Sequence, residues 1–587
     1  MRRKSSGLCL PRRAAVLAVA VFTCVSALSA QSAPAYRDIL DYIENAWPVL
    51  TRSMQDCKTV TEEKFSTQTV LYVAADVPMP PQAAELAQRC HIRVEKLPEP
   101  IHNLGAADLS KIKQAGLLYL PNPYVVPGGF FNEMYGWDSY FIILGLVRAG
   151  KIDLARGMVE NFFYEIEHYG SVLNANRTYY LTRSQPPFLS SMVMAVYDAQ
   201  KAMGKDDREW FSRAYGFIAQ DHAMWTSGEK LAGNTGLSRY FDFGQGPVPE
   251  SFGHEDNYYD AVAKWAMENP QEASAYLATG ADAEKLPNTW PKYSVRLCGG
   301  MNDIRGLQLG ETSRPLEGTK PAENCPTATR ISFTPDFYKG DRAMRESGYD
   351  ISFRFGPFGG STHHYAAVDL NTLLYKEEKD LEQIATTLGK SDEAQHWAQQ
   401  AEARRQSMNR YMWDEQKGMY FDYDFMHGQR SGYVFVTTFY PLWAGIPSPD
   451  QAQRIRENLN VFEEPGGLVT SRNNVKVQWE WPWGWAPSEL LSIEGLRRYG
   501  FQEDANRVTF KFLGNILLNF RREKTIREKY NVVTRSSEAE IQAGYKQNVV
   551  GFGWTNGTFL KLLNELPPEW KTKLGSATEA SRSGGLQ

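Results

Sequence analysis

The sequence is short of the residues that carry metal, redox and nucleophilic chemistry. Its 587 residues include six cysteines and nine histidines, with no Cys-x-x-Cys pair, no Gly-x-Ser-x-Gly and no Walker or dinucleotide-binding motif. His363 and His364 form an isolated pair without spaced partners, so a metal site has little support. The net charge is −4, and there is no long basic run, so nothing favours a nucleic-acid partner.

A long apolar run occurs once, near the start. Basic residues precede the run 14–30 and small residues follow it, which is typical of a signal peptide over 1–30. The Arg12-Arg13 pair leaves a twin-arginine export route open. No later stretch is long and apolar enough to span a membrane. We therefore expect a periplasmic or secreted, soluble and monomeric protein.

Four cysteines follow the expected cleavage site. In an exported protein they would form one or two disulfides. The pairs Cys57–Cys90 and Cys298–Cys325 close the shorter loops, but the sequence leaves the pairing open.

Helical periodicity dominates the rest of the chain. Leu370, Leu374, Leu381 and Leu388 mark one apolar face, and Gly389 stands where a helix should end. A second helix is expected from Ser391 to about Trp413, and similar units over 140–165, 188–203, 257–278, 450–460, 487–499 and 502–520. Long loops rich in Gly, Pro and aromatic residues lie between these helices, which indicates an all-α toroid around a central pocket.

The expected domain organisation is simple. After the signal peptide, residues 31–100 should pack on a helical body that covers 101–565 without an internal linker. The small, polar tail 566–587 is expected to be disordered.

Two acids stand in aromatic surroundings. In 127–141, Asp138 follows Trp137, so it is either a helix N-cap or a carboxylate that binds sugar hydroxyls beside an indole. In 345–355, Asp350 is flanked by aromatic residues, and burial would raise its pKa toward that of a general acid. A structural ion pair with a neighbouring arginine is the alternative for Asp350.

Three further loops are less specific. In 174–190, Asn176, Arg183 and Gln185 alternate with aromatic residues, which suits a structural loop and a polar pocket wall equally well. Glu528 lies in a charge run whose default interpretation is solvent exposure. The segment "QWEWPWGWAPSE" has a tryptophan at every second position from Trp479 to Trp485, but its Pro and Gly argue against a ladder strand.

Taken together, these segments resemble the trehalase family of glycoside hydrolases. "PGGFFNEMYGWDSY" and "QWEWPWGWAP" are similar to the two family signatures, and "YYLTRSQPP", "PES", "ESGYD", "EKY" and "GFGWTNG" occur in the family's order between about 100 and 565. The resemblance implies an (α/α)6 barrel that hydrolyses an α-glucoside with inversion, using no metal and no cofactor. It also implies that the Trp-rich segment is a loop at the barrel mouth, where one or two of its indoles touch sugar.

The resemblance assigns residues as well. Asp350 matches the general acid and Glu528 the general base. Substrate-binding positions are implied for Phe131, Tyr135, Trp137, Asp138, Asn176, Arg183, Gln185, Glu250, Gly348, Trp479, Trp485 and Trp554.

Several positions depart from the family pattern. Phe130 and Val248 replace arginines, Tyr545 replaces a binding glutamate, and Glu480 replaces an aspartate. Loss of the groups at 248 and 545 indicates an altered leaving-group subsite beside a retained glucose subsite. The sequence therefore predicts an exported hydrolase of α,α-trehalose. The alternatives are an α-glucosidase for a different α-glucoside and, ranked lower, a sugar-binding protein without turnover.

Overall fold

The computed structural model describes residues 36–61, 68–252, 258–297, 304–309, 328–538, 540–541 and 548–583. Most of these residues are helical, and the strands are short. No helix in these ranges is both long and apolar enough to cross a membrane.

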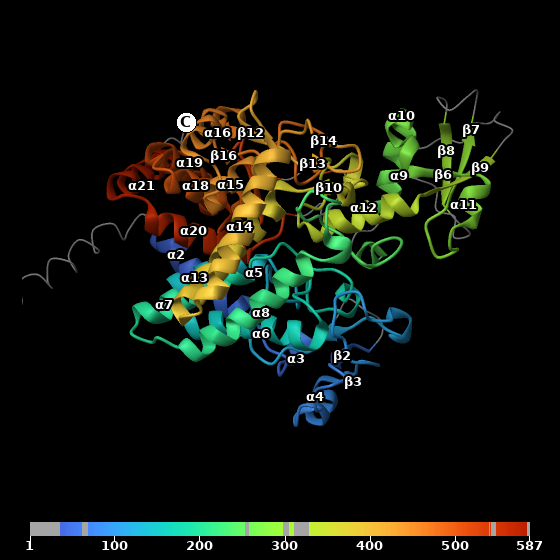
Figure 1. Cartoon of the computed structure of the whole chain (residues 1–587), viewed down its shortest axis with the longest axis horizontal. Coiled ribbons are helices and arrows are strands. Elements are labelled where there is room, and N and C mark those ends of the chain that lie inside the picture. Colours follow the sequence, from blue (N-terminus) through green and yellow to red (C-terminus); the bar gives the residue numbers. More distant parts are fainter. Residues whose placement is uncertain are drawn as a thin grey trace, which may run out of the picture.

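Six helices of the described chain form a closed inner ring. Each packs against the next and the last packs against the first, in the order α5 (Asp138–Arg148), α7 (Leu189–Ala202), α13 (Val368–Leu388), α15 (Tyr440–Ala444), α18 (Ala486–Arg498) and α20 (Gly553–Glu565). Each of the first five is followed by an outer helix: α6 (Ile152–Tyr169), α8 (Arg208–Trp225), α14 (Ser391–Tyr411), α16 (Pro449–Glu457) and α19 (Gln502–Glu523). The last inner helix, α20, is instead contacted by α2 (Arg37–Leu50), which comes from the N-terminal part of the chain (Figure 1). This arrangement confirms the predicted (α/α)6 barrel.

Inner and outer helices differ in how much of their surface is buried. In α18, every residue from Ala486 to Ile493 is buried, as expected for a helix that is covered on all sides. The outer helix α14 buries only Trp397, Ala401, Arg404 and Met408, which form a single stripe.

Short turns between paired helices set the direction of the ring. The pair α13 and α14 is joined at Gly389, whose left-handed φ of 79° ends α13 as the sequence predicts. Because such turns make the partners antiparallel, the inner helices run in the same direction. Their N-terminal ends, and the long loops that enter them, therefore meet at one end of the barrel.

Some predicted boundaries were wrong. The expected helix 140–165 is two helices, because Gly150 (φ 72°) separates α5 from α6. The expected helix 257–278 ends early: α9 (Tyr258–Glu268) is followed by α10 (Pro270–Ala273) and strand β6 (Leu277–Thr279). The tail was expected to be disordered from 566, but α21 (Pro568–Ser583) packs on α19.

Two smaller units flank the ring (Figure 1). Near the N-terminus, β2 (Val70–Val73) pairs in parallel with β3 (Arg93–Lys96) and β4 (Leu117–Leu118). The second unit follows α9 and has an antiparallel sheet in the order β6, β9 (Ala328–Phe333), β7 (Tyr293–Leu297) and β8 (Ile304–Leu309). Its separate core includes Val248, Tyr259, Phe333 and Phe337.

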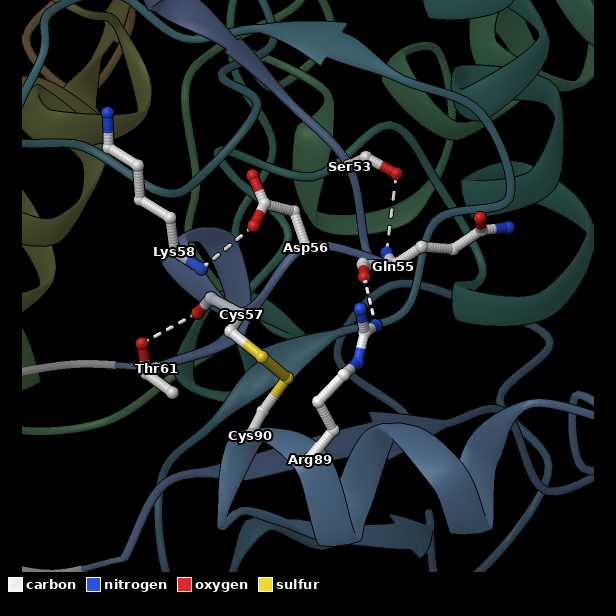
Figure 2. The surroundings of a disulfide bond; sticks show 8 residues. All are labelled: Ser53, Gln55, Asp56, Cys57, Lys58, Thr61, Arg89 and Cys90. Carbon is white, nitrogen blue, oxygen red and sulfur yellow. Dashed lines mark hydrogen bonds between the residues drawn. A yellow bond between two sulfur atoms is a disulfide. The ribbon is translucent and has the colours of Figure 1, made fainter.

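A disulfide fixes the N-terminal unit (Figure 2). Cys57, in α3 (Cys57–Val60), is bonded to Cys90 at the end of α4 (Ala83–Cys90), with 5.1 Å between their Cα atoms. The Arg89 guanidinium donates a hydrogen bond to the Gln55 carbonyl, which also ties the two segments together. Of the two pairings that the sequence left open, Cys298–Cys325 lies outside the described residues.

Reduction of this disulfide is expected to destabilise the protein. The bond spans 33 residues of chain, and closure of a loop of that length removes about 3–4 kcal/mol of unfolded-state entropy. The double variant Cys57→Ser/Cys90→Ser should therefore unfold at lower urea concentration than the wild type. A reductant should have the same effect on the wild type and none on the double variant. Equal midpoints for oxidised and reduced wild type would contradict this expectation.

A pair of buried acids lies between α8 and α13. Asp221 and Glu377 are at most 2% exposed, and neither carboxyl has a hydrogen-bond partner among the described residues. Burial raises the pKa of Asp221 to about 7. Burial, with the charge of Asp221 added, holds the pKa of Glu377 well above its ordinary value. The adjacent Glu378 differs because Arg404 and His222 bond to it, so its pKa is lowered in spite of burial.

Neutralising the pair is expected to stabilise the protein at pH 7. Between about pH 5 and 7 the native state holds protons on Asp221 and Glu377 that the unfolded chain has lost, so the free energy of unfolding falls as pH rises. Glu377→Gln should raise the free energy of unfolding by roughly 1–3 kcal/mol at pH 7 and make it depend less on pH. Glu378→Gln, one position along the same helix, should lower it. Thermal unfolding between pH 5 and 8 tests both signs, and a loss of stability in Glu377→Gln would contradict the assignment.

Candidate active site

Aromatic side chains from four segments of the chain meet at the N-terminal end of the ring. Trp137 lies 5.6 Å from Tyr349, 5.8 Å from Trp479 and 5.6 Å from Trp554 between ring centroids. Trp479 stacks face to face on Trp485 at 3.8 Å. All five rings are nearly buried. The motifs that the sequence marked as unusual are therefore brought together, although they are hundreds of residues apart.

Three carboxyl groups lie close enough at this end to interact. Asp138 is the first residue of α5 rather than its N-cap, and it is 5% exposed. Burial raises its pKa well above the ordinary value, and the charges of Glu528 and Asp350 raise it further. Because the charges of both Glu528 and Asp350 act on Asp138, the two predicted catalytic acids lie in one region, although 178 positions separate them.

The Trp-rich segment holds the Asp350 loop in place. Gln478 donates its side-chain amide to the Asp350 carbonyl, and the Trp479 N–H bonds to the Ile351 carbonyl at 3.2 Å. Glu480 accepts hydrogen bonds from the Ser352 hydroxyl at 2.9 Å and the Phe353 N–H at 2.7 Å. The glutamate that replaces the family's aspartate thus fixes the turn that follows Asp350.

Buried ion pairs support the same loop on both sides. Before it, Glu346 at the end of α12 (Pro335–Glu346) accepts a 2.5 Å bond from Lys230, and both side chains have no exposed surface. After it, Arg354 bonds to Asp369 at 2.6 Å and to Asp422 at 2.6 and 2.8 Å. Asp350 therefore stands on a backbone that is anchored at each end.

Glu528 is held by the last inner helix and by a short strand pair. Its carbonyl accepts hydrogen bonds from Trp554 Nε1 at 3.1 Å and Thr555 Oγ1 at 3.3 Å, and its carboxylate accepts one from Lys529 at 2.8 Å. Strand β17 (Trp483–Trp485) pairs with β18 (Lys529–Asn531). Trp483 and Trp485 therefore lie in a ladder strand, which the sequence argued against, whereas Trp479 and Trp481 lie in turns as expected for a loop. The default interpretation of Glu528 as a solvated charge was wrong, because Glu528 is 8% exposed.

A second polar cluster contains Arg183, which is 1% exposed. Its guanidinium pairs with Glu250, and its Nε lies 3.9 Å from Asp242. Burial lowers the pKa of Arg183, but the charges of Glu250 and Asp242 outweigh this and raise it. Arg183 Nε and Nη1 and Glu250 Oε2 are buried without hydrogen-bond partners among the described residues. Buried donors without partners are uncommon, and a ligand with hydroxyl groups would satisfy them.

Other predicted binding residues fix the backbone around Trp137 and Met134. Asn176 accepts a 2.8 Å bond from the Met134 N–H and donates one of 2.8 Å to the Leu118 carbonyl, so its amide joins backbone segments. Gln185 accepts a 2.9 Å bond from the Trp137 N–H. Gly348 has φ 76°, and a Cβ there would lie 2.8 Å from the Trp137 ring.

Two of the remaining positions that depart from the family pattern, Phe130 and Val248, lie among the described residues. Phe131 packs on Tyr135 and Phe552. The Phe130 ring, which is 46% exposed, lies 3.9 Å from the Phe131 ring between centroids and is tilted by 33°. Val248 is completely buried in the second core and offers no charge. Tyr545 lies outside the described residues.

One charged residue near Glu250 was missed from the sequence. Arg345 is 3% exposed, and its Nη1 lies 3.9 Å from Glu250 Oε1. Its guanidinium also lies over the Tyr258 ring, 4.7 Å from the centroid. The only available signal was its place directly before "ESGYD", where a charge run resembles any exposed helix end.

Comparisons with known proteins support the fold and identify the family. The trehalase family model matches residues 25–286 and 332–567. Cytosolic neutral trehalases of Kluyveromyces lactis and Saccharomyces cerevisiae are 35% and 34% identical, over 75% and 77% of this chain and 56% and 58% of their own lengths. The solved structure of neutral trehalase Nth1 from Saccharomyces cerevisiae matches with a TM-score of 0.71 at 29% identity, covering 92% of this chain and 96% of that one.

The chain belongs to the trehalase family of glycoside hydrolases. It spans a little more than half the length of the curated relatives that it matches. The family match omits 287–331, which contains β7, β8 and part of β9.

The prediction of a periplasmic or secreted protein needs correction. The curated relatives named above are cytosolic neutral trehalases, and this finding overturns the expectation of export. The segment 1–30, on which that expectation rested, lies outside the described residues.

Proposed function

We propose that this chain hydrolyses α,α-trehalose to two glucose molecules with inversion, with Asp350 as general acid and Glu528 as general base. The observation that supports the proposal is that the charges of both Asp350 and Glu528 act on the buried carboxyl group of Asp138, the first residue of α5. Family membership supports the reaction class.

The chemistry needs two carboxyl groups on opposite faces of the sugar. Asp350 would protonate the glycosidic oxygen as the bond to the first glucose breaks. Glu528 would take a proton from the water that attacks the anomeric carbon from the other side, for which the carboxyl groups should be ~6.5–9.5 Å apart. No proton or electron has to come from any other group.

Asp138 and Arg183 are proposed to bind the sugar. The raised pKa of Asp138 favours a neutral carboxyl group. This group can donate a hydrogen bond to one sugar hydroxyl and accept a hydrogen bond from another, with the Trp137 ring beside it. The buried Nε and Nη1 of Arg183 would donate to hydroxyl groups of the substrate. Each such bond from a charged donor contributes about 1.5–3 kcal/mol.

An α-glucoside with an apolar leaving group is the second candidate substrate. The exposed Phe130 ring offers apolar surface where the family resemblance implies an arginine, and Val248, at the position of the second arginine, is buried and carries no charge. A hydrophobic aglycone would bury the Phe130 ring, whereas a second glucose would gain no charged hydrogen bond there.

Proton NMR of the purified chain with trehalose tests the proposal. Inversion at one anomeric carbon releases one β-glucose and one α-glucose, so equal initial amounts of the two anomers are expected before mutarotation. Two α-anomers would show retention and overturn the mechanism. If the folded protein releases no glucose from trehalose but cleaves an aryl α-glucoside, the second candidate is correct. Binding without cleavage of either compound would indicate a sugar-binding protein.

A further inference from the structure

A cluster of three possible metal ligands lies outside the candidate active site. Asp336 is in the first turn of α12, and His363 and His364 are in the short 3-10 helix η7 (Thr362–His364). Asp336 Oδ1 is 2.9 Å from His363 Nε2 and 3.2 Å from His364 Nε2. Among the described residues, this is the one group of three such side chains whose ligand atoms all lie within 4.8 Å of one another.

The η7 segment is fixed by contacts outside the cluster. Arg239 donates a 2.9 Å bond to the His363 carbonyl, and the Phe425 N–H donates one of 3.2 Å to the His364 carbonyl. The His364 N–H bonds to the Ser361 carbonyl at 2.9 Å. These bonds fix the backbone that carries the two imidazoles whether or not an ion is present.

The helix that carries Asp336 is equally fixed, and the cluster is open to solvent. Thr334 caps α12 by accepting a 3.1 Å bond from the Phe337 N–H. The side chain of Asp336 is 54% exposed, that of His364 21% and that of His363 7%. An ion can therefore enter from the surface without opening the fold.

The donor set selects the class of ion. Two imidazole nitrogens and one carboxylate oxygen suit Zn²⁺, Ni²⁺, Co²⁺ and Cu²⁺ rather than Mg²⁺ or Ca²⁺. Ligand atoms bound at ~2.1 Å from one ion lie ~3.0–3.4 Å apart, which is close to the spacings seen here.

We propose that Asp336, His363 and His364 bind one divalent transition-metal ion of the zinc class. The site is separate from the reacting carboxyl groups. Asp336 and the histidines lie on either side of the segment 347–361, which carries Asp350. A bound ion therefore joins the first turn of α12 to η7, the two elements that precede and follow the segment with the proposed general acid, and water fills its remaining coordination positions.

Titration of the full-length chain, prepared without a histidine tag and treated with a chelator, tests this site. Calorimetry with Zn²⁺, and visible absorption with Co²⁺, should show one high-affinity ion per chain. Changes outside the coordination shell alone cost about 10–100-fold in metal affinity, so His364→Asn and Asp336→Asn should each weaken binding at least ~100-fold. Zn²⁺ should raise the melting temperature of the wild type and not of either variant.

The chain offers a matched control. His427 forms a similar surface pair with Asp424, with 2.8 Å between Nδ1 and Oδ2, and no second histidine of the described chain completes a group of three there. His427→Asn should bind Zn²⁺ as the wild type does. Circular dichroism of the metal-free variants shows whether they are folded. Asp336→Asn and His364→Asn are independent tests, because both side chains are partly exposed and their replacement should leave the core intact. The proposal is overturned if the wild type binds no ion at millimolar Zn²⁺, if the two variants bind as tightly as the wild type, or if His427→Asn also loses binding.

Discussion

Asparagine in place of Asp350 is expected to lower kcat for trehalose by about 10²–10⁴-fold, the usual contribution of a general acid. The Asp350 loop is held through its backbone by Gln478 and Trp479. The change should therefore leave the fold intact and shift KM little. Steady-state kinetics on trehalose, with melting temperature as the folding check, measures the effect.

A leaving group that needs no proton separates the two acids. α-Glucosyl fluoride loses fluoride without acid assistance, so Asp350→Asn should hydrolyse it at a rate close to that of the wild type. Glu528→Gln should lose activity on both trehalose and the fluoride, because the attacking water still needs a base. Glu538→Gln, an exposed carboxylate further along the same loop, is the control and should match the wild type. Equal losses on the fluoride in Asp350→Asn and Glu528→Gln would show that the roles are wrongly assigned.

Methionine in place of Arg354 is expected to destabilise the protein by about 3–5 kcal/mol, since it leaves two buried carboxylates without their cation. Asp369 and Asp422 are at most 2% exposed, and Arg354 bonds to both. Arg354 follows Asp350 in the same loop, so kcat should fall as well. Thermal and urea unfolding measure the first effect and trehalose kinetics the second.

Two further variants isolate the charge effect. Adding Asp369→Asn and Asp422→Asn to Arg354→Met removes the uncompensated charges and should recover at least ~1 kcal/mol. Arg405→Met breaks an exposed pair with Glu402 and should cost at most ~1 kcal/mol. A loss no larger in Arg354→Met than in Arg405→Met would show that the buried network contributes little.

Sequence periodicity was informative where helices are long and have one apolar stripe. The boundaries of α13 and α14 follow from the leucine spacing, Gly389 and Ser391. The inner helix α15 was missed because its five residues, "YPLWA", are too few to show a period and include Pro441. The break between α5 and α6 was missed because apolar residues continue on both sides of Gly150.

The candidate site was predictable only in part. Sequence motifs located Asp138, Asp350 and the tryptophans, because unusual residues cluster in those loops. They could not show that Glu528 is buried, since a charge run has the same local pattern on a surface and in a pocket. Nor could they show that Lys230 pairs with Glu346, because 116 positions separate the two residues and no local rule links them.

The contact between α5 and α20 has a consequence for folding. A Cβ on Gly557 would lie 2.1 Å from the Phe141 carbonyl, so the first and last inner helices touch through their backbones. Bringing Phe141 and Gly557 together closes a loop that contains most of the ring, which costs entropy. Contacts between residues so far apart in the sequence slow folding. Until α20 packs between α18 and α5, the ring of helices is incomplete, exposes apolar helix faces and is prone to aggregate. Because Trp554 and Thr555 of α20 also hold Glu528, we expect catalytic competence to appear in the last step of folding, together with ring closure.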